Sequence, residues 1–264
     1  MRRYSIIYLI ILLIYLQSCS TVPIIGRKQL NLLPESQLVS LSLTNYKSFI
    51  DSAEVYHTGE YLEMVKDCGV KISEAVEQFL KQNNLEDRIT SFDWEFNLVK
   101  DSIPNAWCMP GGKVVFFDGI LPICETEQGV AVVMGHEIAH AVARHGNERM
   151  SQGLVSQMGG MALDAALEEK PEETQNIFMT AYGIGAQLGV MLPYSRKHEY
   201  EADKLGLVFL TMAGYDPNEA IRFWERMAKV NSSVLPEFLS THPISENRVE
   251  ALRNALPEME KYRP

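Results

Sequence analysis

Residues 129–143, GVAVVMGHEIAHAVA, decide the fold, because they form an apolar run interrupted by one polar trio, His136, Glu137 and His140, in the pattern HExxH. On an α-helix, residues four apart lie about 40° around the axis, so both imidazoles share one face and suit two ligands of one zinc ion. Glu137 lies about 100° from His136, where it can border the metal as general base for the attacking water. Two ordinary surface histidines are the alternative, but a polar trio inside an apolar run needs partners.

A catalytic zinc usually takes three protein ligands, so a third must lie elsewhere. His145 lies about 140° from His140 on a continuing helix, and we interpret it as a structural residue at the helix end. Glu199 is the better candidate, because it shares a helix face with Asp203 at i, i+4 in EYEAD. Asp203 is then placed to orient a ligand imidazole through its other nitrogen.

The composition of the chain is that of a globular protein, with 264 residues, 46% hydrophobic and 22% charged. Its formal net charge of −10 repels nucleic acid, and no nucleic-acid partner is expected. No CxxC spacing is present, so a thiolate zinc site is not expected. Beyond Cys19 the cysteines are Cys68, Cys108 and Cys124, an odd number whose pairing the sequence leaves open.

The N-terminus predicts export. Arg2 and Arg3 precede an apolar stretch, residues 4–16, that is shorter than the ~20 residues of a bilayer span but fits a signal-peptide core. The following LQSC, residues 16–19, resembles the lipobox of bacterial lipoproteins. An uncleaved anchor helix is the alternative.

The lipobox divides the chain into three predicted parts. We expect a lipoprotein signal peptide over 1–18, a tether over 19–35 lipidated at Cys19, and a metallopeptidase domain over 36–264. Ser20 after the cysteine favours the outer membrane, facing the periplasm, by resemblance to lipoprotein sorting.

The pattern of apolar residues predicts an α+β fold, mostly helical, with a small β-sheet beside the active-site helix. Strands are expected over 89–100 and 113–117, on either side of a turn-rich bend over 105–112. The strand after the bend is a candidate to take an extended peptide by strand addition, and an ordinary sheet edge is the alternative.

Several helices are expected around this sheet. Thr126 is the expected N-cap of one long helix over 126–149. Residues 153–192 are expected to hold two helical stretches that pack in the core or form a mobile lid. The other helices are expected over 36–52, 60–82, 195–213, 217–230 and 245–255.

Five stretches carry a family resemblance: GRKQLNLLPES (26–36), NAWCMPGG (105–112), HEIAH (136–140), YSRKHEYEAD (194–203) and THPISENRV (241–249). Together they resemble the gluzincin family of the CAAX prenyl proteases and HtpX, most closely its secreted bacterial lipoprotein branch. The resemblance implies a zincin fold, proteolysis, and one zinc ion on His136, His140 and Glu199, with Glu137 as general base. Glu201 is the alternative carboxylate, less favoured because it lies on a different helix face from Asp203.

His242 and Arg248 match the late His-Pro…Arg element of the same family. His242 is the candidate donor to the oxyanion that forms when water attacks the carbonyl, or else an inhibitor of the site. Arg248 would support His242 or the carboxylates. The alternative is that Pro243 merely starts a helix whose neighbours lie on the surface.

The sequence thus predicts a membrane-anchored zinc endopeptidase that hydrolyses envelope proteins. The resemblance alone suggests a quality-control role on misfolded proteins. A non-proteolytic zinc-containing envelope chaperone or binding lipoprotein is the alternative, against which the intact Glu137 argues. A structural lipoprotein with a vestigial site is less favoured, because all three predicted ligands are present. The physiological substrate, its cleavage preference and the oligomeric state stay open.

Overall fold

The computed structural model describes residues 19–187, 192–230, 242 and 246–264. These form two compact units. The smaller unit comprises residues up to 35 together with 144–195, and the larger unit comprises 36–143 together with 196–264. The predicted signal peptide, residues 1–18, lies outside the described residues and stays a prediction.

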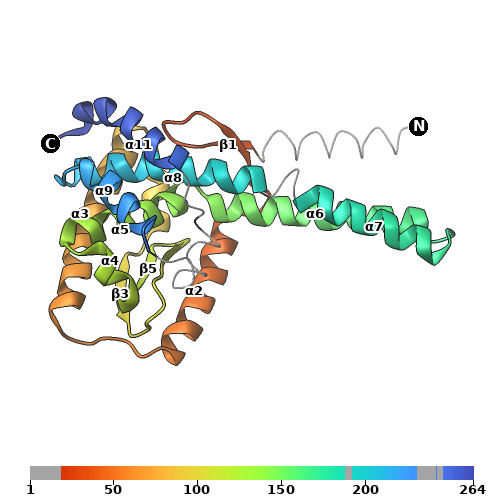
Figure 1. The fold of residues 1–264 in the computed structure, drawn as a ribbon, viewed down its shortest axis with the longest axis horizontal. Coiled ribbons are helices and arrows are strands. Elements are labelled where there is room, and N and C mark those ends of the chain that lie inside the picture. The colour runs from red at the N-terminus through yellow and green to blue at the C-terminus, as the bar shows by residue number, and fades with distance from the viewer. Residues whose placement is uncertain (1–18, 188–191, 231–241, 243–245) are drawn as a thin grey trace. The chain divides into compact units, whose positions relative to one another are not determined.

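A three-stranded sheet organises the larger unit (Figure 1). Its strands are β3 (Glu95–Val99), β4 (Ala106–Met109) and β5 (Lys113–Phe117), in the order β3-β5-β4. β5 is parallel to β3, antiparallel to β4 and buried along its whole length, as its sequence KVVFF favours. The expectation that the strand at 113–117 accepts a peptide was therefore wrong, because both of its edges are already paired. β4 is the edge strand that contacts the histidine helix.

Two details of this sheet differ from the sequence prediction. The first part of the predicted strand over 89–100 belongs to a 3-10 helix, η1 (Glu86–Ser91). There Thr90 and Ser91 donate their hydroxyls to backbone carbonyls three residues earlier, which favours a local turn. The predicted bend over 105–112 contains β4, and only its end is a turn. Gly111 and Gly112 make that turn with φ of 94° and 83°, values that glycine adopts without strain.

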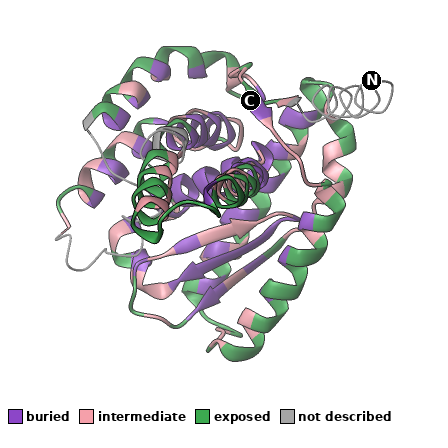
Figure 2. Ribbon diagram, turned by 90° about the vertical axis from the view of Figure 1, so that its right-hand side faces the viewer, coloured by how far each residue is buried: buried purple, intermediate pink, exposed green. Residues whose placement is uncertain are grey.

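Helices cover the sheet of the larger unit. α3 (Glu60–Gln82) packs its buried face on β3 and on α5 (Glu127–Val142), and α2 (Glu35–Ser52) contributes Tyr46 to a cluster with Val99, Val115 and Phe117. Figure 2 shows that the buried residues concentrate on the strands and on the inner faces of the helices. The other helices are α4 (Leu121–Cys124), α8 (Leu192–Met212), α9 (Asn218–Met227) and α11 (Glu246–Met259).

The histidine helix α5 begins at the predicted cap. The Thr126 hydroxyl accepts a hydrogen bond from the Gly129 amide at 3.3 Å. The helix ends at Val142, however, and a single helix over 126–149 was the wrong prediction. Arg144 adopts the left-handed conformation with φ of 58°, and α6 (His145–Leu167) begins directly after it. His145 is fully buried at the start of α6 rather than at the end of α5.

The smaller unit combines the N-terminal segment with a helical hairpin. β1 (Cys19–Thr21) pairs with β2 (Lys28–Leu30), and β2 contacts α6. Arg27 donates two hydrogen bonds of 2.7 Å to Glu148, whose side chain is 1% exposed. Asn147 donates to the Leu33 carbonyl. The segment predicted as a tether, residues 19–35, is thus folded against the first turns of α6. α7 (Glu172–Ala186) packs along α6 and buries none of its own side chains.

The prediction of a mostly helical α+β fold with a small sheet is confirmed. Within the described part of the chain, no helix has the length and apolar character needed to cross a membrane.

The three cysteines beyond Cys19 do not pair with one another. Cys68, Cys108 and Cys124 are free thiols in this structure. Burial raises the pKa of each of them above the usual thiol value, so all three stay protonated near neutral pH.

Candidate metallopeptidase site

The close crossing of α5 and α8 brings together the halves of the predicted site. Gly135 and Gly206 lie at the crossing, where a Cβ on Gly206 would come 3.0 Å from the His136 backbone nitrogen. A Cβ on Gly135 would lie 3.1 Å from the Gly206 carbonyl oxygen. Both contacts are tighter than a side chain normally accepts, so glycine at these positions lets the two backbones approach closely. Glu199, earlier on α8, therefore reaches the imidazoles of α5.

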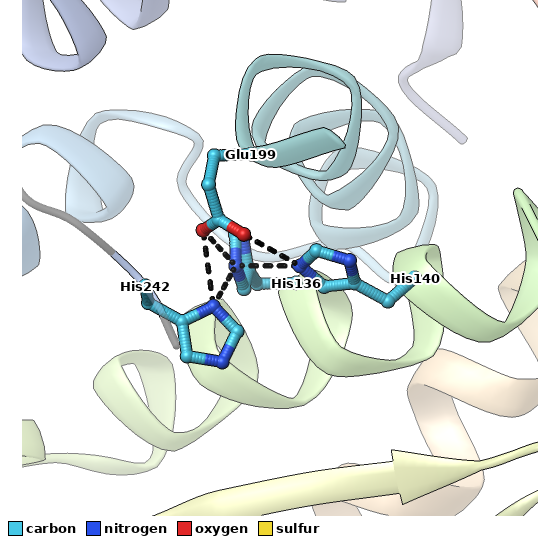
Figure 3. A group of neighbouring side chains, drawn as sticks. All are labelled: His136, His140, Glu199 and His242. Atoms are coloured by element: carbon cyan, nitrogen blue, oxygen red, sulfur yellow. Dashed lines mark hydrogen bonds and ion pairs between the residues drawn. The ribbon is translucent and has the colours of Figure 1, made fainter. Parts of the chain in front are cut away.

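Four side chains with little or no exposure converge at this crossing: His136 and His140 from α5, Glu199 from α8, and His242 (Figure 3). The Nε2 atoms of His136 and His140 are 3.2 Å apart. Glu199 Oε2 is 3.3 Å from His136 Nε2, and Oε1 is 3.4 Å from His140 Nε2. Ligand atoms about 2.0–2.1 Å from a tetrahedral zinc lie about 3.4 Å from one another. The spacing of the side chains thus fits a zinc ion.

Asp203 and Arg248 form the support behind His136. Asp203 Oδ1 is 3.0 Å from His136 Nδ1, which leaves the other ring nitrogen for a metal. Arg248 donates from Nε and Nη2 to the two Asp203 oxygens, each at 2.7 Å. Burial raises the pKa of Asp203, but the Arg248 guanidinium and, after it, the His136 imidazole together outweigh burial and hold that pKa below its usual value. Asp203 is therefore a carboxylate, which can accept a hydrogen bond from the imidazole Nδ1–H.

The carboxylates Asp203 and Glu199 also affect the charge of His136. Burial lowers the pKa of His136, but hydrogen bonds to Asp203 and Glu199 outweigh it and raise that pKa to about 9. Burial raises the pKa of Glu199, but the three surrounding histidines lower it far more. A metal ion must displace the proton of a ligand histidine, so metal binding here is coupled to proton release.

His242 faces both the predicted metal ligands and the predicted base. Its Nδ1 lies 3.0 Å from Glu199 Oε2 and 3.2 Å from His136 Nε2. Its Nε2 lies 3.4 Å from Glu137 Oε1. The ring therefore spans the space between the ligands and Glu137.

All the residues predicted for the site lie in this one region of the larger unit. The predicted ligands His136, His140 and Glu199 belong to the group that could hold a metal, whereas the alternative Glu201 does not. His242 is the fourth member of that group, although the sequence predicted it as an oxyanion donor or an inhibitor rather than a possible ligand.

Two residues that shape the site were missed by the sequence analysis. Gly135 and Gly206 permit the close helix crossing, but neither carries chemistry of its own. Their position inside predicted helices could have pointed to them. A glycine inside a helix costs about 1 kcal/mol of helix stability relative to alanine, which calls for a packing reason.

Comparison with known proteins agrees with this geometry. The model of "Peptidase family M48" matches residues 70–256. The chain belongs to peptidase family M48. With the buried His–Glu group, this makes it a zinc metalloendopeptidase with a single zinc ion.

Relatives of this M48 peptidase include "Mitochondrial metalloendopeptidase OMA1" of Schizosaccharomyces pombe, 32% identical over 94% of the chain and 70% of the relative. "Metalloendopeptidase OMA1, mitochondrial" of Homo sapiens is 29% identical over 97% of the chain and 49% of the relative. "Putative beta-barrel assembly-enhancing protease" of Vibrio cholerae is 32% identical over 58% of the chain and 33% of the relative. The chain thus spans about half or less of the length of several relatives.

Proposed function

We propose that this M48 peptidase is a membrane-anchored endopeptidase that cuts unfolded or misassembled proteins of the cell envelope. The observation that carries the proposal is the buried set of His136, His140 and Glu199 with Glu137 beside it. The quality-control role has weaker support, namely the family resemblance and relatives whose names refer to β-barrel assembly.

In the proposed hydrolysis, the residues around the metal position have different roles. His136, His140 and Glu199 would hold a zinc ion, which would supply Lewis-acid chemistry to the scissile carbonyl and the attacking water. Glu137 takes the proton of that water on its carboxylate and passes it to the leaving amine. Asp203 accepts a hydrogen bond from the Nδ1–H of His136 and so fixes the tautomer that presents Nε2 to the metal.

We assign His242 the role of guard, a residue that blocks the site, rather than oxyanion donor. Its ring lies against Glu199 on one side and Glu137 on the other, at 3.0 Å and 3.4 Å. In this proposal the ring occupies the space that the attacking water and the peptide carbonyl would use, and His242 leaves it before substrate is cut. A protein that keeps its zinc closed in this way also fits the alternative function, a non-proteolytic chaperone.

The anchor is proposed on sequence grounds. LQSC at 16–19 and the short apolar core before it fit a lipid on Cys19, which would hold the enzyme on a membrane. Ser20 after the cysteine favours the outer membrane, facing the periplasm. Cys19→Ala should then abolish lipidation and leave residues 1–18 attached. Mass spectrometry of the mature wild-type protein tests this directly, because an unmodified Cys19 rules out the lipoprotein.

Proteolysis is tested with the full chain purified in detergent. Casein and a reduced, unfolded protein are the substrates, and the same protein in its folded form is the control. Cleavage of the unfolded substrates that stops with a chelator and returns with zinc supports the proposed function. Tight binding of the unfolded substrates without any cleavage would instead establish the chaperone.

A further inference from the structure

Trp224, on α9, contacts both Arg248 and His136, which are linked to each other through Asp203. Its side chain is buried, with 3% exposure. The Arg248 guanidinium carbon lies 4.1 Å from the centroid of its ring, within the range of a cation–π contact. The His136 ring lies at its edge, with centroids 5.4 Å apart and planes at 72°. Trp224 thus contacts a predicted metal ligand and the cation that supports it.

These contacts close a loop of four side chains. Arg248 holds Asp203 through two hydrogen bonds of 2.7 Å, and Asp203 holds His136 Nδ1 at 3.0 Å. Trp224 completes the loop from Arg248 back to His136. The members come from α9, α11, α8 and α5, so the loop ties together four helices that are separate in the sequence.

The helix that carries Trp224 is itself fixed in place. Arg226 donates to the carbonyls of Ile123 and Cys124, both at 3.1 Å, and to Glu219 at 2.7 Å. The two bonds to the carbonyls hold α9 against the C-terminal end of α4, and the bond to Glu219 fixes the Arg226 side chain within α9. Because the Trp224 indole is rigid and its helix is fixed, it limits how far the Arg248 guanidinium can tilt and how far the His136 ring can rotate.

We propose that Trp224 is a positioning residue that fixes the Arg248–Asp203–His136 support and thereby sets the affinity of the site for zinc. The proposal rests on the proposed metal site, because it requires zinc to bind His136. Residues that orient metal ligands without touching the metal typically change its affinity by about 10–100-fold when they are removed.

The first experiment compares two substitutions of Trp224 with a control. Trp224→Met keeps apolar volume but removes the aromatic face, whereas Trp224→Phe keeps a ring. Phe79→Met is the matched control, because Phe79 is fully buried in the same unit and packs on Phe209 instead. Zinc dissociation constants are measured by competition with a chromogenic chelator, and thermal unfolding is followed in parallel.

We expect Trp224→Met to weaken zinc binding by about 10–100-fold and Trp224→Phe to recover most of that loss. Phe79→Met should lower the unfolding temperature and leave the zinc affinity unchanged. Equal zinc affinity in wild type and Trp224→Met would overturn the proposal. So would an equal loss in Phe79→Met, since Trp224 would then act only through stability.

A second experiment leaves the fold intact even where Trp224→Met does not fold. The chain has three tryptophans, and all can be replaced biosynthetically by fluorinated analogues, which weaken the negative face of the ring. Zinc affinity should fall stepwise with the number of fluorine atoms, and the trend should vanish in a Trp224→Phe background. A trend that persists in that background, or no trend at all, would contradict the proposal.

Failure of the underlying metal site gives a different result. His140→Ala should release zinc from an otherwise wild-type protein. If wild type and His140→Ala bind the same amount of zinc, or neither binds any, the proposed metal site is wrong. If that release occurs and the Trp224 variants bind zinc like wild type, the positioning role alone is wrong.

Discussion

Helices α5 and α6 follow one another directly in the sequence but differ in which of their side chains are buried. α5 buries thirteen of its sixteen residues, nearly all of them apolar around the polar trio. α6 buries six of its 23 residues, and five of these are polar residues in its first turns. Apart from the buried Leu167, the large apolar side chains that stand out on α6 are exposed ones, with Met158 and Met161 at 68% and 67%. Apolar content therefore does not show which helix lies in a core.

The contrast extends to the two units. In the larger unit, buried polar groups are held by several partners and converge on a metal position. In the smaller unit, the buried polar residues Asn147 and Glu148 tie the N-terminal segment to α6. Buried polar groups thus form the proposed metal site in the larger unit and attach the N-terminal segment to α6 in the smaller unit. Substitutions should separate these two uses of buried polar groups.

The largest expected effect separates chemistry from stability. Glu137→Gln keeps the size of the side chain but removes the base, so cleavage should fall by at least about 100-fold. Zinc content and unfolding temperature should stay at wild-type values. Peptide hydrolysis, metal analysis and thermal unfolding measure the three quantities.

Glu148→Gln is the matched control in the smaller unit. It should cost about 1–3 kcal/mol of stability, because it removes the charge that Arg27 contacts, and should leave the zinc content unchanged. Undiminished cleavage by Glu137→Gln would mean that the base lies elsewhere.

The next effect concerns the third metal ligand. Glu199→Ala should lose most of its zinc, because Glu199 lies against both imidazoles. Glu201→Ala is the neighbouring control, buried on the same helix but outside the metal group, and should retain zinc. Metal analysis of the two purified variants decides between them. Zinc loss in Glu201→Ala with retention in Glu199→Ala would reverse the assignment.

The site could be predicted where it depends on helix geometry alone. His136 and His140, and likewise Glu199 and Asp203, share a face because they are four residues apart. The end of α5 could not be predicted, because Arg144 takes a left-handed conformation that tertiary contacts must hold.

Contacts between distant helices were also beyond the sequence. The close approach at Gly206 requires knowledge of which helix α8 meets. Trp224 carries no local signal that links it to Arg248, which lies on another helix. His242 was predicted as a site residue, but its place between Glu199 and Glu137 depends on the folded chain.

A smaller effect of opposite sign is expected at His242. His242→Ala should cleave unfolded substrate faster than wild type, because it clears the space between Glu199 and Glu137. Zinc should stay bound through the three proposed ligands, His136, His140 and Glu199. Initial rates at several substrate concentrations test this. A variant with lower kcat and unchanged KM would instead make His242 the oxyanion donor.

The smallest effect tests the exposed hairpin directly. Met158→Ala should change the free energy of unfolding by less than about 0.5 kcal/mol, because the side chain already faces water. Phe209→Ala, in the core of the larger unit, should cost about 3–5 kcal/mol, because Phe209 is fully buried against Phe79. Urea unfolding of both variants measures the difference. If Met158→Ala lowered the free energy of unfolding as much as Phe209→Ala does, the side chains of the α6–α7 hairpin would have to be buried in solution. The contrast between α5 and α6 would then not hold for the protein in solution.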